Sequence, residues 1–298
     1  MTDIYSTIIS KTPIDKGWSG DQKYRAVTRD GSVYLLRVAA PERAERKKRE
    51  FAQMQRVAAL GIPMCKPIEF GTCDEGVYSL QSFIEGYDAE EYIPTLPAKR
   101  QYEYGYEAGK ILSRIHTIPA PDGVPEWESR FNAKIDRKIA MYRDCPLKYD
   151  VDAPMLDYIA SNRHLLKNRP QSYQHGDYHI GNMMVDVNGN LVIIDFDRDD
   201  YGDPWEEFNR IVWCVGASPA FASGMVDGYF GGNVPDAFWR LLALYICSNT
   251  LSSLPWAIPF GEREITTMKN QQAEVLAWYD CMRRIVPTWY KTENIYER

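Results

Sequence analysis

The sequence lacks the cysteine and histidine patterns of a metal or disulfide module. It has only four histidines, and its six cysteines form no C-x-x-C pair and no cluster at metal-binding spacing. The cysteines lie singly, at Cys65, Cys73, Cys145, Cys214, Cys247 and Cys281. This absence excludes a zinc module and indicates reduced thiols, as in a reducing compartment.

Long hydrophobic runs and a surplus of positive charge are also missing. The longest apolar run, Leu241 to Cys247, is far below membrane-spanning length, and the start of the chain does not read as a targeting segment. We therefore expect a cytoplasmic protein with no membrane partner. Acidic residues number 41 against 35 basic ones, a net charge of -6, so we expect no nucleic-acid partner either. If the protein binds a phosphate group, a few specifically positioned side chains must hold it, because the overall charge does not attract it.

What the sequence does contain is typical of a folded globular protein. Hydrophobic residues make up 45% of the chain and charged residues 26%, which excludes a disordered or fibrous class. The length of 298 residues is enough for two domains at roughly 150 residues each.

The first part of the sequence predicts a small antiparallel sheet with one helix. Alternating β-branched and aromatic residues over 22–39 flank an Asp30-Gly31 turn, which is typical of a hairpin. A helical pattern over 41–60 follows, and its basic run Arg46 to Arg49 is interpreted as a solvated helix face. Further strands are expected at 65–70 and 77–84. Residues 1–84 are thus predicted to form an N-terminal lobe.

The second part, residues 85–298, predicts a mainly helical lobe. The segments long and periodic enough for helices are 99–117, 130–143, 153–167, 204–214, 235–252 and 263–284. A second hairpin is expected at 183–195, around Asn188-Gly189. The predicted fold class is α+β, with a sheet-rich small lobe and a helical large lobe.

The most informative stretch is His175-Gly-Asp-Tyr-His-Ile-Gly-Asn182, followed by the hairpin and then Ile194-Asp-Phe-Asp197. The hairpin folds the second acidic segment back toward the first. Asp177, Asn182 and Asp195 then supply oxygen-bearing side chains to one site. Phosphoryl transfer needs such a set, because a carboxylate must face the acceptor hydroxyl and oxygen ligands must hold a hard cation.

This pattern resembles the signature of the aminoglycoside phosphotransferase and choline kinase-like family, a branch of the eukaryotic-like kinases. The resemblance implies a bilobal protein kinase-like fold. It implies that Asp177 is the catalytic carboxylate and that Asn182 and Asp195 are Mg²⁺ ligands. The downstream Gly202-Asp203-Pro204 also matches the family, and Asp203 is expected to be structural.

The same resemblance places the nucleotide site in the first lobe. Arg37 stands on the second strand where the kinase fold has its phosphate-binding lysine, and its expected partner is Glu50, with Glu45 as the runner-up. Ser19 lies in a small-residue loop that would close over the phosphates. The hinge that would hold the purine comprises Gln81, Ser82, Phe83 and Ile84.

The predicted function is a magnesium-dependent phosphotransferase that moves the γ-phosphate of ATP or GTP to a hydroxyl group of a small molecule. The resemblance favours an aminoglycoside-type antibiotic as the acceptor, which phosphorylation would inactivate. The alternatives are a kinase of another small alcohol (a macrolide, a choline-like amine or a sugar metabolite) and a pseudoenzyme that only binds nucleotide.

Three acidic residues after the predicted metal ligand, Asp197, Asp199 and Asp200, are the candidates for contact with a cationic acceptor. The other interpretation of these residues is a solvated turn. The choice between ATP and GTP, the acceptor and the oligomeric state stay open at this point.

Overall fold

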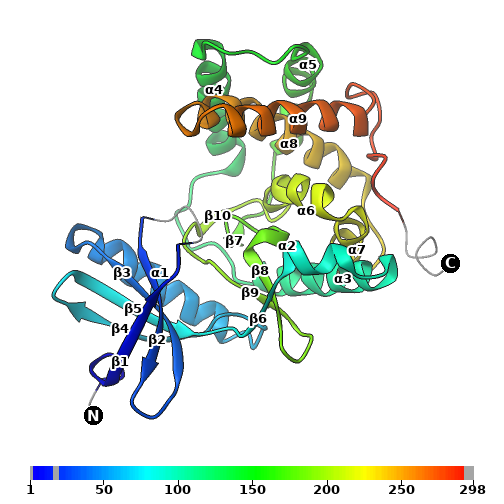
Figure 1. Ribbon diagram of the computed structural model, residues 1–298. Helices are drawn as coiled ribbons and strands as arrows, with labels where there is room; N and C mark the ends of the chain where they lie inside the picture. Colours follow the sequence, from blue (N-terminus) through cyan, green and yellow to red (C-terminus); the bar gives the residue numbers. More distant parts are fainter. Residues whose placement is uncertain (1–2, 16–19, 292–298) are drawn as a thin grey trace. The chain divides into compact units, whose positions relative to one another are not determined.

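The computed structural model describes residues 3–15 and 20–291, and Figure 1 shows how their helices and strands follow one another. The chain divides into two compact units. The first consists of residues 1–89 and 182–199, and the second of residues 90–181 and 200–298. Each unit is described by itself.

A five-stranded antiparallel sheet forms the body of the first unit, in the order β1-β2-β3-β5-β4. Its strands are β1 (Ile8–Pro13), β2 (Gln22–Thr28), β3 (Val33–Ala39), β4 (Pro67–Cys73) and β5 (Gly76–Ser82). The predicted hairpin of β2 and β3 is confirmed, and Gly31 takes the left-handed backbone that its turn requires, with φ 83°. The edge strand β1 was not predicted, because most of its side chains are exposed and show no alternation.

The predicted helix after the hairpin is present as α1 (Ala44–Ala58), preceded by a 3-10 turn at Pro41–Arg43. Met54 and Val57 are its buried residues. The sheet has its own apolar cluster, in which Leu36 and Leu80 are fully buried. Helix α1 contacts β4 and β5 of this sheet.

The second predicted hairpin is also confirmed, but it belongs to the first unit. Its strands β8 (Met183–Asp186) and β9 (Leu191–Ile193) form a small sheet with β6 (Gly86–Asp88). Ile193 donates its backbone N–H to Pro63 at 3.1 Å and accepts one from Cys65 at 3.0 Å. These hydrogen bonds explain why residues 182–199 group with the N-terminal unit, across the division predicted after residue 84.

The second unit is helical apart from one pair of short strands, β7 (Ser172–Gln174) and β10 (Asp200–Gly202). Its helices are α2 (Ala89–Tyr92, which begins at the boundary), α3 (Ala98–Ile115), α4 (Trp127–Asp144), α5 (Ala153–Asn162), α6 (Ile211–Ala217), α7 (Pro219–Phe230), α8 (Asp236–Ala257) and α9 (Glu262–Trp278). Short 3-10 segments lie at Tyr5–Thr7, Ile93–Thr95, Arg163–Leu166, Ile180–Asn182, Glu206–Arg210 and Ile258–Phe260. The helices predicted from periodicity are present with shifted ends, except that most of the segment predicted over 204–214 is the 3-10 segment Glu206–Arg210 and α6 begins only at Ile211.

Helix α7 was not predicted, and its packing shows why. A Cβ atom on Gly224 would lie 2.1 Å from the carbonyl oxygen of Tyr102 in α3, and one on Gly228 would lie 2.0 Å from that of Tyr106. The facing positions of α3 are also glycines, Gly105 and Gly109. Glycine lowers intrinsic helix propensity. The glycines that permit close packing therefore make this segment look like a poor helix former in the sequence.

Helix α8 and the turn after it, Asp236–Phe260, are long and apolar enough to cross a membrane by length and composition alone. In the structure, 67% of the most apolar window of this segment is buried. Core helices of globular units pass the same test, so this finding alone does not indicate a membrane span.

Candidate active site

Arg37 on β3 lies at the centre of a group of carboxylates in the first unit. Its Nε lies 3.2 Å from Asp21 Oδ2, its Nη1 lies 2.7 Å from Asp195 Oδ1, and its Nη2 lies 2.9 Å from Asp197 Oδ2. The guanidinium is only 7% exposed. Burial acts to lower the pKa of Arg37, but the carboxylates of Asp195, Asp197 and Asp21 outweigh it and hold that pKa above its ordinary value. Arg37 therefore stays charged while it holds Asp195 in place.

The expected pairing of Arg37 with Glu50 is wrong. Glu50 Oε2 lies 2.7 Å from Lys47 Nζ, and Glu50 Oε1 lies 2.6 Å from Arg46 Nε on the same helix. The runner-up, Glu45, is exposed. The reason is local: Lys47 precedes Glu50 by one helical turn and reaches it directly, whereas the fork of Arg37 is taken up by three aspartates.

Lys47 also reaches Asp21, whose Oδ2 lies 2.8 Å from Nζ. Asp21 is 1% exposed, and burial alone would raise its pKa. Lys47, Arg37 and Arg43 outweigh that effect and lower the pKa of Asp21 below its ordinary value. The ionised Asp21 thus ties strand β3 to helix α1 through two cations.

A small pocket lies beside these charges within the first unit. Both charged and apolar side chains line the pocket. The lining residues are Asp21, Arg37, Lys47, Glu50, Phe51, Met54, Ser79, Gln81, Phe196 and Asp197. Two cations are thus close to apolar surface, a combination that suits a ligand with both anionic and apolar parts.

Of the predicted hinge residues, Gln81 and Ser82 end strand β5. Gln81 is buried, and Ser82 accepts a hydrogen bond from the Lys66 backbone N–H at 2.8 Å. Phe83 and Ile84 follow in a segment with no regular structure, so their backbone groups lie outside the strand ladder. Ser19, predicted to lie over the phosphates, falls outside the described residues.

Asn182 and Asp195 flank the β8–β9 hairpin, whose register pairs Met183 with Ile193. The Ile194 backbone N–H donates to the Asn182 carbonyl at 3.0 Å, so the two predicted metal ligands leave the hairpin at the same end. Asp195 has φ 67°, a conformation that costs a non-glycine residue energy and that often marks a functional position.

These two residues supply one amide oxygen and one carboxylate, and the Asp195 side chain is 27% exposed. That donor set fits Mg²⁺, which prefers oxygen ligands and retains several waters. Within residues 3–15 and 20–291 there is no group of three or more His, Cys, Asp or Glu side chains placed to hold a metal by themselves. A metal here would therefore need ligands from its own waters or from a bound phosphate.

Asp177 lies in the second unit, on the loop after β7, and its carboxylate is held by an arginine and a histidine. Arg210 Nε lies 3.1 Å from Asp177 Oδ1, and His179 Nε2 lies 3.7 Å from the same oxygen. The Asp177 side chain is 17% exposed. The carboxylate is thus oriented by its neighbours and still accessible to a ligand.

The loop that carries Asp177 is fixed from behind by the segment after β10. Glu207 accepts the Gly176 backbone N–H at 2.8 Å, and Glu207 is itself buried near His116, at 3.7 Å. Asp203 is fully buried and accepts from Arg169 at 2.7 and 2.9 Å and from Tyr245 at 2.5 Å. The structural role expected for Asp203 is confirmed.

The three acidic residues considered for the acceptor are placed differently from one another. Asp197 is paired with Arg37, and Asp200 lies 3.3 Å from Arg130 Nη2 and is mostly exposed. Asp199, which lies between these two residues in the sequence, is half-buried. Two of the three carboxylates therefore already have an arginine partner.

Sequence reasoning missed Asp21, Lys47 and Arg210. Lys47 stood in a basic run interpreted as a solvated face, although its i,i+3 spacing to Glu50 was a usable signal. Asp21 and Arg210 meet partners distant in sequence, Arg37 and Asp177, and no local pattern marks them.

The fold is that of the kinase-like phosphotransferases. Residues 11–241 match the model of the phosphotransferase enzyme family, and the chain belongs to that family. It is therefore a small-molecule kinase. No curated protein matches the chain.

Several solved structures share the fold at low sequence identity. A thermostable mutant of an aminoglycoside phosphotransferase, in ternary complex with ADP and hygromycin B, aligns with TM-score 0.64 at 16% identity over 91% of this chain and 95% of that one. A choline/ethanolamine kinase family protein from Mesorhizobium loti aligns with TM-score 0.65 at 16% identity over 92% and 91%. Amicoumacin kinase in complex with AMP-PNP, Ca²⁺ and its ligand aligns with TM-score 0.64 at 14% identity over 96% and 91%. These likenesses confirm the predicted kinase-like α+β fold.

Proposed function

We propose that this kinase transfers the γ-phosphate of a nucleoside triphosphate to a hydroxyl group of a small organic molecule, with Asp177 as the catalytic carboxylate. The observation that carries the proposal is the cluster around Arg37, which joins Asp195 to the wall of a pocket that also contains Lys47. Cations at such a wall suit phosphate groups. The neighbouring structures, whose ligands include ADP, AMP-PNP and Ca²⁺, support a nucleotide donor and a divalent cation.

In the proposed reaction, the acceptor oxygen forms a bond to the γ-phosphorus while the bond between phosphorus and the β–γ bridging oxygen breaks. The electron pair of that bond leaves with the nucleoside diphosphate, and the proton of the acceptor hydroxyl passes to the Asp177 carboxylate. Arg210 orients this carboxylate through its contact at 3.1 Å. Placement of this kind contributes most of the catalysis in phosphoryl transfer.

On the donor side, Arg37 and Lys47 bind the phosphates, and Phe83 and Ile84 offer backbone groups to the purine. Lys47, with Glu50 as its partner, forms the lysine–glutamate pair that the sequence assigned to Arg37 and Glu50. Asn182 and Asp195 would hold Mg²⁺, which when bound supplies neutralising charge to the phosphates.

For the acceptor, an aminoglycoside-type antibiotic is the first class to test, because a neighbouring structure holds hygromycin B. Phosphorylation would inactivate such a compound and confer resistance. The alternatives are a macrolide, a choline-like amine and a sugar metabolite.

The test is nucleotide turnover with Mg²⁺ and ATP or GTP across hydroxylated compounds of these classes. Asp177→Asn is expected to lower kcat by about 10²–10⁴-fold while the nucleotide Kd changes less than twofold, because the carboxylate acts on the acceptor. Asp157→Asn, an exposed aspartate of α5 in the same unit, is the matched control and should leave both values unchanged. Turnover by Asp177→Asn at the wild-type rate would remove Asp177 from the reaction.

A further inference from the structure

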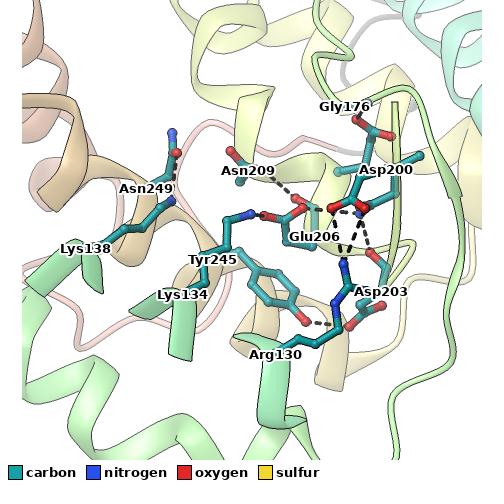
Figure 2. Close-up of polar contacts among 12 residues, drawn as sticks. Arg130, Lys134, Lys138, Gly176, Asp200, Asp203, Glu206, Asn209, Tyr245 and Asn249 are labelled. Atoms are coloured by element: carbon teal, nitrogen blue, oxygen red, sulfur yellow. Dashed lines mark hydrogen bonds and ion pairs between the residues drawn. The ribbon is translucent and has the colours of Figure 1, made fainter. Parts of the chain in front are cut away.

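A row of three cationic side chains follows one face of α4 in the second unit. Arg130, Lys134 and Lys138 recur every four residues, so they lie one above another along the helix. Figure 2 shows Lys134 reaching Glu206 and Lys138 reaching Asn249. Arg130 is paired with Asp200 at 3.3 Å, and Lys134 is paired with Glu206 at 3.0 Å.

Lys138 differs from the other two because it has no carboxylate partner among the described residues. Its one hydrogen bond there is to the side-chain oxygen of Asn249 on α8, at 3.2 Å. A lysine ammonium has three donors, and burying it without an opposite charge is unfavourable.

The charges around Lys138 add to this cost. Burial and the positive charges of Lys134, Arg210 and Arg137 together lower the pKa of Lys138 to about 7, against the opposing effect of the Glu206 carboxylate. Among the groups that act most strongly on Lys138, only Glu206 is negatively charged, and Lys134 already shares it. The site thus has more positive charge than the protein itself balances.

This group of cations is connected to the proposed catalytic carboxylate. Arg210 lies 3.1 Å from Asp177, and the same side chain acts on the charges of Lys138 and Glu206. Glu206 also accepts from Gln174 at 3.2 Å, at the end of the strand that leads into the catalytic loop. Arg210 therefore contacts Asp177 and also acts electrostatically on Lys138 within the same unit.

We propose that the acceptor substrate of this kinase carries an anionic group, a carboxylate or a phosphate monoester, which binds to Lys138 with support from Lys134 and Arg210. The proposal rests on the proposed function. The anion supplies the counter-charge that Lys138 lacks, and the hydrogen bond to Asn249 leaves two of the three ammonium donors for the ligand. The same cations repel a polycationic acceptor, since like charges at an interface cost binding energy. Among the candidate acceptors named above, this site therefore favours an anionic sugar metabolite over an aminoglycoside.

The first experiment measures nucleotide turnover at pH 7 with four acceptors that share one sugar skeleton: glucose, gluconate, glucose 6-phosphate and glucosamine. We expect gluconate or glucose 6-phosphate to have a KM at least tenfold lower than that of glucose, with glucosamine the poorest. The two anions distinguish a carboxylate from a phosphate site. Preferential turnover of glucosamine would overturn the proposal.

The variant Lys138→Met keeps most of the side-chain length and removes the charge. It is expected to raise the KM of the anionic acceptor at least tenfold, to leave the KM of glucose within twofold, and to leave the nucleotide KM unchanged. The matched control is Arg143→Met, which removes a charge from an exposed position of the same helix and should change none of these values. An equal effect of the two variants would show that only general electrostatic attraction operates.

A binding measurement separates this proposal from the proposed function. Gluconate should raise the Tm of the wild-type protein more than glucose does, and this difference should vanish in Lys138→Met. An equal shift for both sugars, or a gluconate shift retained in Lys138→Met, overturns the anion site whether or not turnover is found. Failure of ATP with Mg²⁺ to bind would instead overturn the proposed function and leave the gluconate result to decide the site.

Discussion

Removal of the Lys138 ammonium is expected to stabilise the protein at low pH, although the substitution deletes a hydrogen bond. In the unfolded chain lysine has a pKa near 10.5, whereas burial lowers the pKa of Lys138 to about 7 in the folded protein. Each pKa unit corresponds to about 1.36 kcal/mol, so the full difference has an upper bound of about 5 kcal/mol. Water penetration and side-chain relaxation reduce this, and we expect about 2 kcal/mol.

The sign of the pH dependence follows from proton linkage. Between pH 7 and pH 10.5 the unfolded chain holds a proton on Lys138 that the folded protein has released. The contribution of Lys138 to the free energy of unfolding therefore rises with pH across this range. The penalty is fully present below pH 7 and is lost as the pH approaches 10.5.

Thermal unfolding of the wild-type protein and Lys138→Met from pH 6 to pH 10 tests this reasoning. At about 2–4 °C per kcal/mol, the variant should unfold roughly 4–8 °C higher at pH 6, and the gap should close toward pH 10. Other titrating groups are common to both proteins, so the difference isolates Lys138. A variant that is less stable at pH 6, or a gap that is constant with pH, would refute the account. Arg143→Met, at an exposed position of the same helix, should show no such pH dependence.

Three further outcomes follow from the contacts. Arg37→Met should lower stability by about 3–5 kcal/mol in thermal unfolding, because the buried Asp21 loses one of its cations and Asp195 and Asp197 lose their arginine partner. Arg37→Lys should restore only part of the loss. Lys47→Met should raise the nucleotide KM about tenfold or more, while Lys48→Met, on the exposed side of the same helix, should leave it unchanged. Equal nucleotide KM values for the two variants would remove Lys47 from the phosphate site. Gly224→Ala should lower stability by about 1–3 kcal/mol, since its Cβ would lie 2.1 Å from the Tyr102 carbonyl oxygen. A Cβ on Gly216 would meet nothing within 4 Å, so Gly216→Ala should cost little, and equal Tm values for the two variants would contradict the packing argument.

The sequence predicted the elements whose patterns are local. The β2–β3 hairpin, helix α1 and the hairpin between Asn182 and Asp195 each have turn residues and periodicity within a short window, and the structure confirms them. Helix α7 was missed because Gly224 and Gly228 are required by contact with α3, and glycine is a poor helix former by itself.

The candidate site was predictable where a contiguous motif carries it. Asp177, Asn182 and Asp195 were predicted in this way and stay candidates, whereas Asp21 and Arg210 act through partners distant in sequence. The partner of Arg37 was predicted wrongly for the same reason. The analogy supplied a position on a neighbouring helix, but the ion pairs that form depend on which side chains reach one another in the folded unit.

Phosphorus NMR of a mixture of ATP, Mg²⁺ and the best acceptor tests the central claim most directly, because it follows the γ-phosphate itself. The account predicts that the γ-phosphate signal is replaced by the signal of a phosphate ester on the acceptor at a rate that Asp177→Asn lowers by about 10²–10⁴-fold, while Asp157→Asn proceeds as the wild-type protein does. Release of inorganic phosphate only, or ester formation at the same rate in Asp177→Asn, would contradict it.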